Sequence, residues 1–248
     1  MSAESSILRT VVVIPTYNER ENVEPLCLAV LGQGEGIDVL VVDDNSPDGT
    51  WQAAEELSAR EPRVHLLRRP GKLGLGTAHI AGYRWALARG YDRVVTMDAD
   101  FSHPPDAIPA MIEMSCRCDV VIGSRYVKGG GYEGWPLRRV LLSAVSNWVA
   151  RTFLRLEPRD CTGAFRCFRR EALEAVPLEN IVARGYAFQE EMLWQCSGRG
   201  WRFGEVPIVF VQRARGESKI SPKEVCVAVW TVVRLMFTPA GRRRKGGA

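Results

Sequence analysis

The chain of 248 residues lacks the segments that mark membrane-spanning or secreted proteins. Its longest apolar run, residues 225–237, has 13 residues and contains Arg234, whereas a spanning helix needs about 20 apolar residues. No secretory segment opens the sequence, so we expect its seven cysteines to be reduced, in the cytoplasm. Those cysteines are odd in number and scattered, and no pair has the spacing of a zinc finger.

Strong charge of one sign is also missing. The net charge is +4, a mild excess that comes largely from residues 242–245, so no nucleic-acid partner is expected. Internal repeats and low-complexity linkers are absent too. With 46% hydrophobic and 25% charged residues, the chain fits one large globular domain, or one domain with a small appendage.

Apolar runs rich in β-branched residues alternate with helical patterns in the first half of the chain. The expected strands are 10–14, 39–42, 64–67, 93–98 and 119–122, with Pro15 closing the first of them. The expected helices are 22–31, 50–60 and 76–89. Near-continuous apolar strands separated by helices predict an α/β fold with a mostly parallel sheet covered on both faces.

Polar clusters follow three of these strands, at 15–19, 43–44 and 98–100. In open parallel sheets, ligands bind outside the carboxyl ends of the strands. Asp98 and Asp100 stand one residue apart where the backbone can turn, so both carboxylates can reach one cation. Two hard oxygen ligands with open positions suit Mg²⁺ or Mn²⁺ carrying a diphosphate.

Eight segments carry a resemblance to a known family: 15–22, 42–50, 72–78, 97–105, 123–126, 160–166, 185–189 and 216–219. Together they resemble family-2 glycosyltransferases of the GT-A fold, a Rossmann-like sheet with helices on both faces. The segments at 72–78, 123–126 and 216–219 are most similar to polyprenol-phosphate (dolichol-phosphate) mannosyltransferases. The resemblance covers roughly residues 8–237. We expect a catalytic domain at 8–220, followed by an amphipathic helix and basic tail at 221–248.

This resemblance implies transfer of mannose from GDP-mannose to a polyprenyl phosphate, with inversion, for glycan or glycoprotein assembly. By similarity the donor is bound by Pro15, Tyr17, Glu19, Val42, Asp44, Asp98, Ala99, Asp100, Arg125, Arg213 and Lys219. The metal ligands are Asp98 and Asp100, with Ser102 at a position where some members carry Gln. A hydroxyl is a weaker ligand than that amide oxygen, so a water can replace it.

The acceptor side can be checked against the chemistry. A phosphate monoester is already an oxyanion at neutral pH, so it needs cations to hold it and no general base. The three histidines have no obvious setting for a base. Arg139 and Ser143 are four residues apart on a helix expected after Pro136, and so share one face. By similarity they bind the lipid phosphate together with Arg125, and the alternative is a solvated polar stripe. With Asp98 and Asp100, these three residues complete the expected catalytic set.

Membrane contact is expected from the end of the chain. Residues 222–237 predict a helix with Ser221 as its N-cap and a broad apolar stripe, followed by the basic cluster at 242–245. An apolar face plus a basic cluster favours peripheral attachment to the cytoplasmic face of an anionic membrane. The alternative is that this helix packs on the domain or on a membrane-embedded partner subunit.

Two other functions stay open on the sequence. One is transfer of a sugar from a UDP donor to polyprenyl phosphate, because base preference cannot be read residue by residue. The other is a catalytically silent subunit that binds lipid, against which the intact Asp98, Asp100 and Arg125 count. The roles of Glu190 and Glu191 are unassigned, although Glu191 matches the single acidic position of the family.

Overall fold

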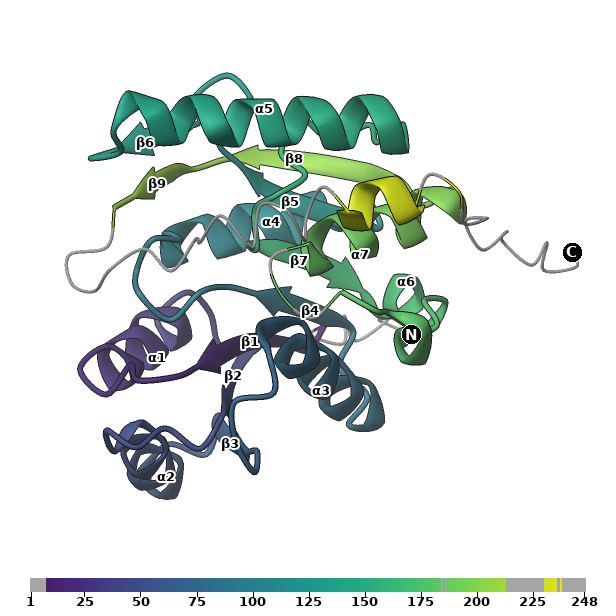
Figure 1. The fold of residues 1–248 in the computed structure, drawn as a ribbon. Helices are drawn as coiled ribbons and strands as arrows, with labels where there is room; N and C mark the ends of the chain where they lie inside the picture. The colour runs from purple at the N-terminus through teal and green to yellow at the C-terminus, as the bar shows by residue number, and fades with distance from the viewer. Residues whose placement is uncertain (1–7, 184, 186, 213–229, 236, 238–248) are drawn as a thin grey trace, which may run out of the picture.

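The computed structural model describes residues 8–183, 185, 187–212, 230–235 and 237, and Figure 1 shows their arrangement. A seven-stranded sheet lies at the centre, with the order β3-β2-β1-β4-β7-β5-β8. Its strands are β1 (Thr10–Thr16), β2 (Ile37–Asp43), β3 (Val64–Arg68), β4 (Arg93–Thr96), β5 (Val120–Ser124), β7 (Arg166–Arg169) and β8 (Phe203–Pro207). A second, two-stranded sheet pairs β6 (Gly131–Glu133) with β9 (Val209–Val211) in parallel.

Helices cover both faces of the large sheet, as the sequence predicts. One face packs against α1 (Val23–Leu31), α2 (Thr50–Arg60) and α4 (Ile108–Met114). The other packs against α3 (Leu75–Ala88), α6 (Arg170–Glu174) and α7 (Phe188–Gly198). The long helix α5 (Leu137–Leu154) lies along the outside of the molecule, at the top of Figure 1. Two single-turn 3₁₀ helices span Pro105–Ala107 and Leu178–Asn180.

The two cores follow from the alternation of side chains along each strand. In β1, Val11 and Val13 point into the core beneath α3, whereas Val12 and Ile14 point into the core beneath α1 and α2. All four side chains are fully buried. Burying one such side chain stabilises the fold by about 1.5–3 kcal/mol, so a strand apolar on both faces is held firmly in register.

The sheet is mostly parallel, which confirms the expected fold class. Strand β7, which the sequence analysis does not predict, runs antiparallel between β4 and β5. The expectation that Pro15 ends the first strand is wrong, because β1 continues through Pro15 to Thr16, paired with β2. Proline's fixed φ is compatible with an extended chain, so the ring costs one backbone donor but does not end the strand. The predicted helices match α1, α2 and α3 to within a residue at each end.

Only part of the expected C-terminal helix falls within the described chain, where residues 230–235 are helical. One side of this turn, with Val232 and Leu235, is buried in the core beneath α3 and α7. Trp230, Val233 and Phe237 are exposed. Among the described residues, no helix combines the length and apolar character needed to cross a membrane. The basic cluster at 242–245 lies outside the described residues.

Close packing of α3 on β1 depends on Gly82. A Cβ added there would lie 2.4 Å from Cγ1 of Val13, inside the buried core. We expect Gly82→Ala to lower the free energy of unfolding by about 1–3 kcal/mol despite alanine's better helix propensity, because overpacking forces the helix off the sheet. Urea denaturation measures this, with Gly71→Ala as the control, since no atom lies within 4 Å of a Cβ at Gly71. Equal midpoints for the two variants would contradict the packing argument.

Candidate active site

The carboxyl ends of β1, β2 and β4 meet at one edge of the sheet, as expected. The register pairs Thr16 with Asp43 and Val13 with Thr96, so the segments that follow these strands lie side by side. The backbone N–H of Met97 also donates to Val13 O at 3.2 Å, and this hydrogen bond places the end of β4 at the same edge. The polar clusters after these strands therefore form one rim.

The adjacent carboxylates after β2 have different environments. Asp43 is fully buried and accepts hydrogen bonds from the Thr16 hydroxyl at 2.8 Å and the Ser46 hydroxyl at 2.6 Å. It therefore holds the turn. Asp44 accepts from backbone N–H of Leu73 at 3.2 Å and lies 3.0 Å from Nε of Arg69. Burial raises the pKa of Asp44, and Arg69 opposes that shift.

Other expected donor-binding residues lie on the same rim, except that the side chain of Val42 is buried. Pro15, Tyr17 and Glu19 are partly exposed, and the Lys72 ammonium lies 4.4 Å above the Tyr17 ring. Val42 is fully buried in the core, so only its backbone can reach a ligand. Lys72 adds a cation to this rim. It lies in the segment 72–78, and the sequence alone assigns it no role.

The acidic pair after β4 sits on a tight turn. Phe101 has a φ of +60°, a conformation that turns the chain back after Asp100. Asp100 accepts from the backbone N–H of Ser102 at 3.1 Å and from its hydroxyl at 2.5 Å. Ser102 thus supports Asp100 directly, and its role as a metal ligand stays a prediction.

His103 holds the same turn in place through a hydrogen bond to its backbone. Its Nδ1 accepts a hydrogen bond from backbone N–H of Asp98 at 3.0 Å, which assigns its proton to Nε2. The ring stacks on Phe165 at 5.1 Å and meets Phe210 edge-on at 5.3 Å. Burial lowers the pKa of His103, so the ring is neutral and acts as a fixed acceptor.

Two carboxylates separated by one residue fit a hexacoordinate cation that takes its other ligands from a diphosphate and water. Among the residues that the structure describes, no group of three His, Cys, Asp or Glu side chains could hold a metal alone. Binding of Mg²⁺ or Mn²⁺ by Asp98 and Asp100, with further ligands from a nucleotide, stays a prediction.

On the other half of the rim, Arg125 is fixed by a buried ion pair. Asp160 is fully buried and accepts from Nε and Nη2 of Arg125, both at 2.7 Å, and from its backbone N–H at 3.1 Å. The Thr162 hydroxyl accepts a further bond from Nη2 at 2.8 Å. Burial alone would raise the pKa of Asp160, but Arg125 holds it below its usual range.

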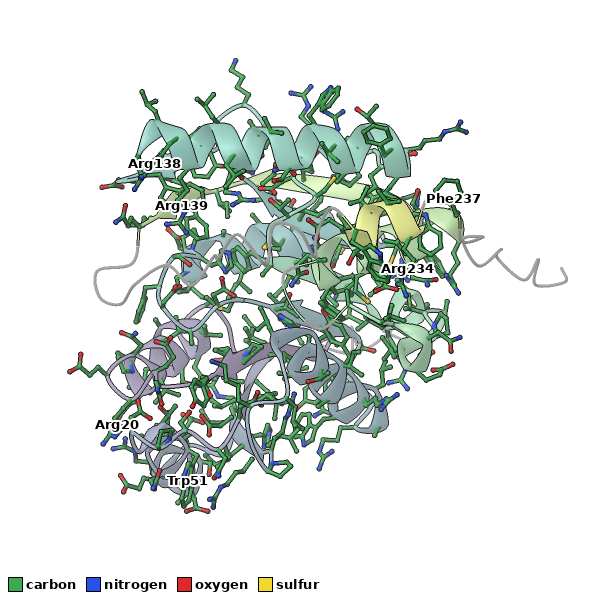
Figure 2. The ribbon with its side chains drawn as sticks, viewed as in Figure 1. Arg20, Trp51, Arg138, Arg139, Arg234 and Phe237 are labelled. Atoms are coloured by element: carbon green, nitrogen blue, oxygen red, sulfur yellow. The ribbon has the colours of Figure 1, made fainter. Side chains whose placement is uncertain are left out.

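Arg139 and Ser143 face this arginine from α5, so the structure brings the three expected acceptor residues together. Arg139 stacks on the Trp135 ring at 3.8 Å, and Figure 2 shows it on the inner side of α5. The Ser143 hydroxyl lies 2.8 Å from that of Tyr126. Four aromatic rings lie 5.4–6.0 Å from the Arg125 guanidinium, those of Tyr126, Tyr132, Trp135 and Phe210.

Comparison with known proteins assigns the family. Residues 11–176, well over half of the chain, match glycosyl transferase family 2. The chain belongs to glycosyl transferase family 2. The undecaprenyl-phosphate mannosyltransferase of Micrococcus luteus is 46% identical over 92% of this chain and 93% of its own length. The polyprenol monophosphomannose synthase of Mycolicibacterium smegmatis is 42% identical over 90% of this chain and 85% of its own.

Solved structures share the fold of this family-2 glycosyltransferase. Glucosyl-3-phosphoglycerate synthase from Mycobacterium tuberculosis, in complex with Mn²⁺, UDP and glucosyl-3-phosphoglycerate, matches with a TM-score of 0.65. The match covers 96% of this chain and 82% of that one at 18% identity. A complex of the same enzyme with Mn²⁺, UDP-glucose and phosphoglyceric acid gives 0.63 at 19% identity, over 96% and 81% of the two chains. These matches confirm the GT-A fold.

The glycosyltransferase uses Glu191 as a structural link, a role the sequence left open. One oxygen accepts from backbone N–H of Val182 at 3.1 Å and of Ala183 at 2.8 Å. The other accepts from the Arg234 guanidinium at 2.7 Å. Glu191 therefore ties the loop before α7 to the helical turn at 230–235. Burial raises the pKa of its neighbour Glu190 to about 7.

Some residues of the candidate site are not predicted by the sequence analysis. Asp160 lies in the segment 160–166, but its pairing with Arg125 spans 35 positions, so no local signal reveals that contact. Tyr132 and Trp135 precede α5 and gave no pattern. Arg213 and Lys219, expected to bind the donor, lie outside the described residues.

The Arg125–Asp160 pair gives a prediction for stability. We expect Asp160→Asn to lower the free energy of unfolding by about 3–5 kcal/mol at pH 7, because it leaves a buried guanidinium without its counter-charge. Since the folded-state pKa of Asp160 is lowered, the pair's contribution is complete above the unfolded value of about 3.9. It is lost as the pH falls through the folded value. Urea denaturation from pH 7 down to pH 3 measures both effects.

The control is Glu174→Gln, which breaks the exposed Arg170–Glu174 pair and should change stability by less than about 1 kcal/mol. An Asp160→Asn variant with wild-type stability, or with an unchanged difference across that pH range, would show that the pair does not hold the site together.

Proposed function

We propose that this glycosyltransferase transfers mannose from GDP-mannose to a polyprenyl phosphate, with inversion at the anomeric carbon. The names of its two mannosyltransferase relatives support the sugar and the lipid phosphate. The observation that carries the proposal in this chain is the acceptor side. There, two arginines and a serine converge, a set of cations and a hydroxyl donor suited to an acceptor that is already an anion.

All three histidines are unsuited to act as a base for a sugar hydroxyl. His79 is fully buried against Phe188, and burial lowers its pKa to about 3. His103 uses Nδ1 to accept a backbone hydrogen bond. His65 packs against Trp85 in a tilted arrangement near the start of β3, toward the opposite edge of the sheet from the strand ends.

On the donor side, Asp98 and Asp100 are the residues that would hold Mg²⁺ or Mn²⁺, with Ser102 supporting Asp100. When bound, the cation neutralises the diphosphate and so favours its departure as an anion. Asp44 and the partly exposed Tyr17 and Glu19 would receive the nucleoside. A guanine offers adjacent N–H groups, and a carboxylate such as that of Asp44 can accept hydrogen bonds from both.

In the transfer step, an oxygen of the lipid phosphate forms a bond to the anomeric carbon of mannose. The bond from that carbon to the diphosphate oxygen breaks, and GDP leaves with the electron pair. Arg125 and Arg139 hold the phosphate oxygens in line with the anomeric carbon. No proton has to be removed, so positioning and charge supply the rate enhancement.

One experiment tests this function. Transfer of radiolabelled sugar into organic-extractable lipid is compared for GDP-mannose, UDP-glucose and UDP-N-acetylglucosamine, with Mg²⁺, with Mn²⁺ and with EDTA. We expect transfer from GDP-mannose alone, and its loss in EDTA. Asp98→Asn or Asp100→Asn should reduce kcat at least a hundredfold, since loss of a charged ligand beside a diphosphate costs several kcal/mol at the transition state.

The matched control is Asp106→Asn, an exposed aspartate in the 3₁₀ helix a few residues further on, which should keep wild-type activity. Transfer from UDP-glucose in place of GDP-mannose would overturn the proposed donor. Activity that persists in EDTA would overturn the metal.

The proposal also includes contact with the membrane that holds the acceptor. The outer side of α5 is apolar and exposed: Leu137, Leu141, Val145 and Trp148 have exposed fractions of 80%, 65%, 55% and 62%. Exposed apolar surface of this extent on one helix usually marks a site of protein or membrane contact. The sequence analysis expected such a face only at the C-terminus.

A lipid bilayer is the occupant that fits α5 best. The opposite side of the same helix carries Arg139 and Ser143, so a phosphate held there has its prenyl chain beside the apolar face. Exposed arginines lie close to both ends of the helix, Arg138 at its start and Arg151 and Arg155 at its end. An apolar face flanked by cations suits an anionic membrane surface.

We expect Leu141→Glu and Trp148→Glu each to reduce co-sedimentation with vesicles that contain anionic lipid severalfold, because a carboxylate on this face must be withdrawn from the interface. Binding of GDP should be unchanged. Leu28→Glu is the control, since Leu28 is 48% exposed on α1, on a different part of the surface. Equal sedimentation of all three variants and the wild type would exclude α5 as the membrane-binding face.

A further inference from the structure

Three hydroxyl groups from three separate elements meet beside Arg125. The Tyr126 hydroxyl donates to Ser143 Oγ at 2.8 Å, and the Tyr132 hydroxyl donates to Tyr126 Oη at 2.6 Å. Tyr132 Oη and Ser143 Oγ are 3.1 Å apart, with either as donor. Tyr126 follows β5, Tyr132 lies in β6 and Ser143 lies in α5. We call these three side chains the hydroxyl triad.

The hydrogen atoms of the triad can close into a ring. Each hydroxyl has one hydrogen to donate, and three donors on three oxygens satisfy one another without a ligand. An arriving oxyanion changes this balance, since a hydroxyl that turns toward it exchanges a neutral hydrogen bond for a charge-assisted one of about twice the strength. The triad is therefore stable when empty and still has donors to offer an anion.

The surroundings of the triad favour an anion. The Arg125 guanidinium lies 5.7 Å from the Tyr126 ring and 5.4 Å from the Tyr132 ring, and Nη1 has no hydrogen bond within the described chain. The Trp135 ring stacks on Tyr132 at 4.6 Å, and its buried indole N–H has no acceptor among the residues that the structure describes. Buried donors without acceptors are rare in folded proteins and point to a missing partner.

The Tyr132 hydroxyl remains a donor at neutral pH. Burial raises the pKa of Tyr132, while the facing Arg125 opposes that shift and the hydrogen bond from Tyr132 to Tyr126 adds to it. The hydroxyl therefore keeps its proton even beside the arginine. A phenolate here would repel a phosphate, whereas a phenol donates to it.

We propose that Tyr126 and Tyr132, together with Ser143, bind the oxygens of the acceptor's phosphate monoester directly. This inference rests on the proposed function and extends the acceptor site from two arginines and a serine to a ring of neutral donors. A monoester dianion gains more from these donors than the phosphodiester monoanion formed after transfer. The triad therefore binds the substrate more tightly than the product, and this difference assists release of the product.

Phenylalanine substitutions isolate the hydroxyls. Tyr126→Phe and Tyr132→Phe retain the rings that pack around Arg125 and against Trp135, and remove only the donors. Tyr91→Phe is the matched control, because the Tyr91 hydroxyl donates to Asp38, away from the strand-end rim. Calorimetric titration measures binding of farnesyl phosphate and of GDP, and steady-state kinetics with GDP-mannose and farnesyl phosphate follow turnover. Melting temperatures verify folding, with Ser143→Ala as a further variant.

We expect each single variant to weaken farnesyl phosphate binding about tenfold and to raise its KM similarly, because hydrogen bonds to charged groups contribute the most. GDP affinity should not change. The double variant should lose less than the product of the single losses, since the hydroxyls act as one network. Wild-type affinity for farnesyl phosphate in both variants, an equal loss of GDP affinity, or no binding of farnesyl phosphate by the wild type would overturn the inference.

The proposed function and the proposed role of the hydroxyl triad can be refuted separately. A wild-type enzyme that binds farnesyl phosphate but transfers no mannose refutes the proposed function, while the binding losses in the variants still support the triad as a phosphate site. Mannose transfer that proceeds equally in wild type and variants upholds the function and refutes the triad.

Discussion

The buried ion pair between Arg125 and Asp160 is the interaction on which the proposed acceptor half of the site depends. It joins the end of β5 to the loop at 160–163, and that loop is joined to α5 through Asn147, which accepts from backbone N–H of Cys161 at 2.6 Å. A buried guanidinium without a partner is strongly unfavourable, so the pair fixes the loop and the helix as one unit. The same contacts that satisfy Arg125 leave one side of it turned toward the aromatic rings and the hydroxyl triad.

The order of the strands separates the charges of the site. The acidic residues follow β2 and β4, whereas Arg125 follows β5, and the antiparallel β7 lies between the two groups. Carboxylates are thereby gathered where a cation and a diphosphate would bind, and guanidinium groups where a phosphate acceptor would bind. The carboxylates of Asp98 and Asp100 and the guanidinium groups of Arg125 and Arg139 therefore follow different strands of the rim. Such preorganised charge acts without rearrangement during the reaction.

The sequence predicted what depends on local pattern. Runs such as that of β1 predicted a parallel sheet, the acidic residues at strand ends predicted the rim, and the spacing of Arg139 and Ser143 predicted their shared face on α5. What depends on distant partners could not be read. Strand β7 has four residues with an arginine at each end, so its sequence carries no strand signal, and it forms because β4 and β5 pair with both of its edges. Val42 followed the family pattern, but packing on α3 buries its side chain.

The clearest example is α5, whose polarity is the reverse of that of an ordinary surface helix. Its polar residues Arg139, Ser143 and Asn147 face the protein, whereas Leu137, Leu141, Val145 and Trp148 face outward. Only toward its end does the helix bury apolar side chains, those of Ala150 and Leu154. A sequence pattern gives the two faces but not which of them is buried. The difference is decided by Thr162, the backbone N–H of Cys161 and the tyrosines, which offer the inner face hydrogen bonds that an apolar face could not use. A lipid phosphate has the same division, with a charged head and an apolar chain. A helix built this way presents a matching surface to each part, which fits both roles proposed for α5.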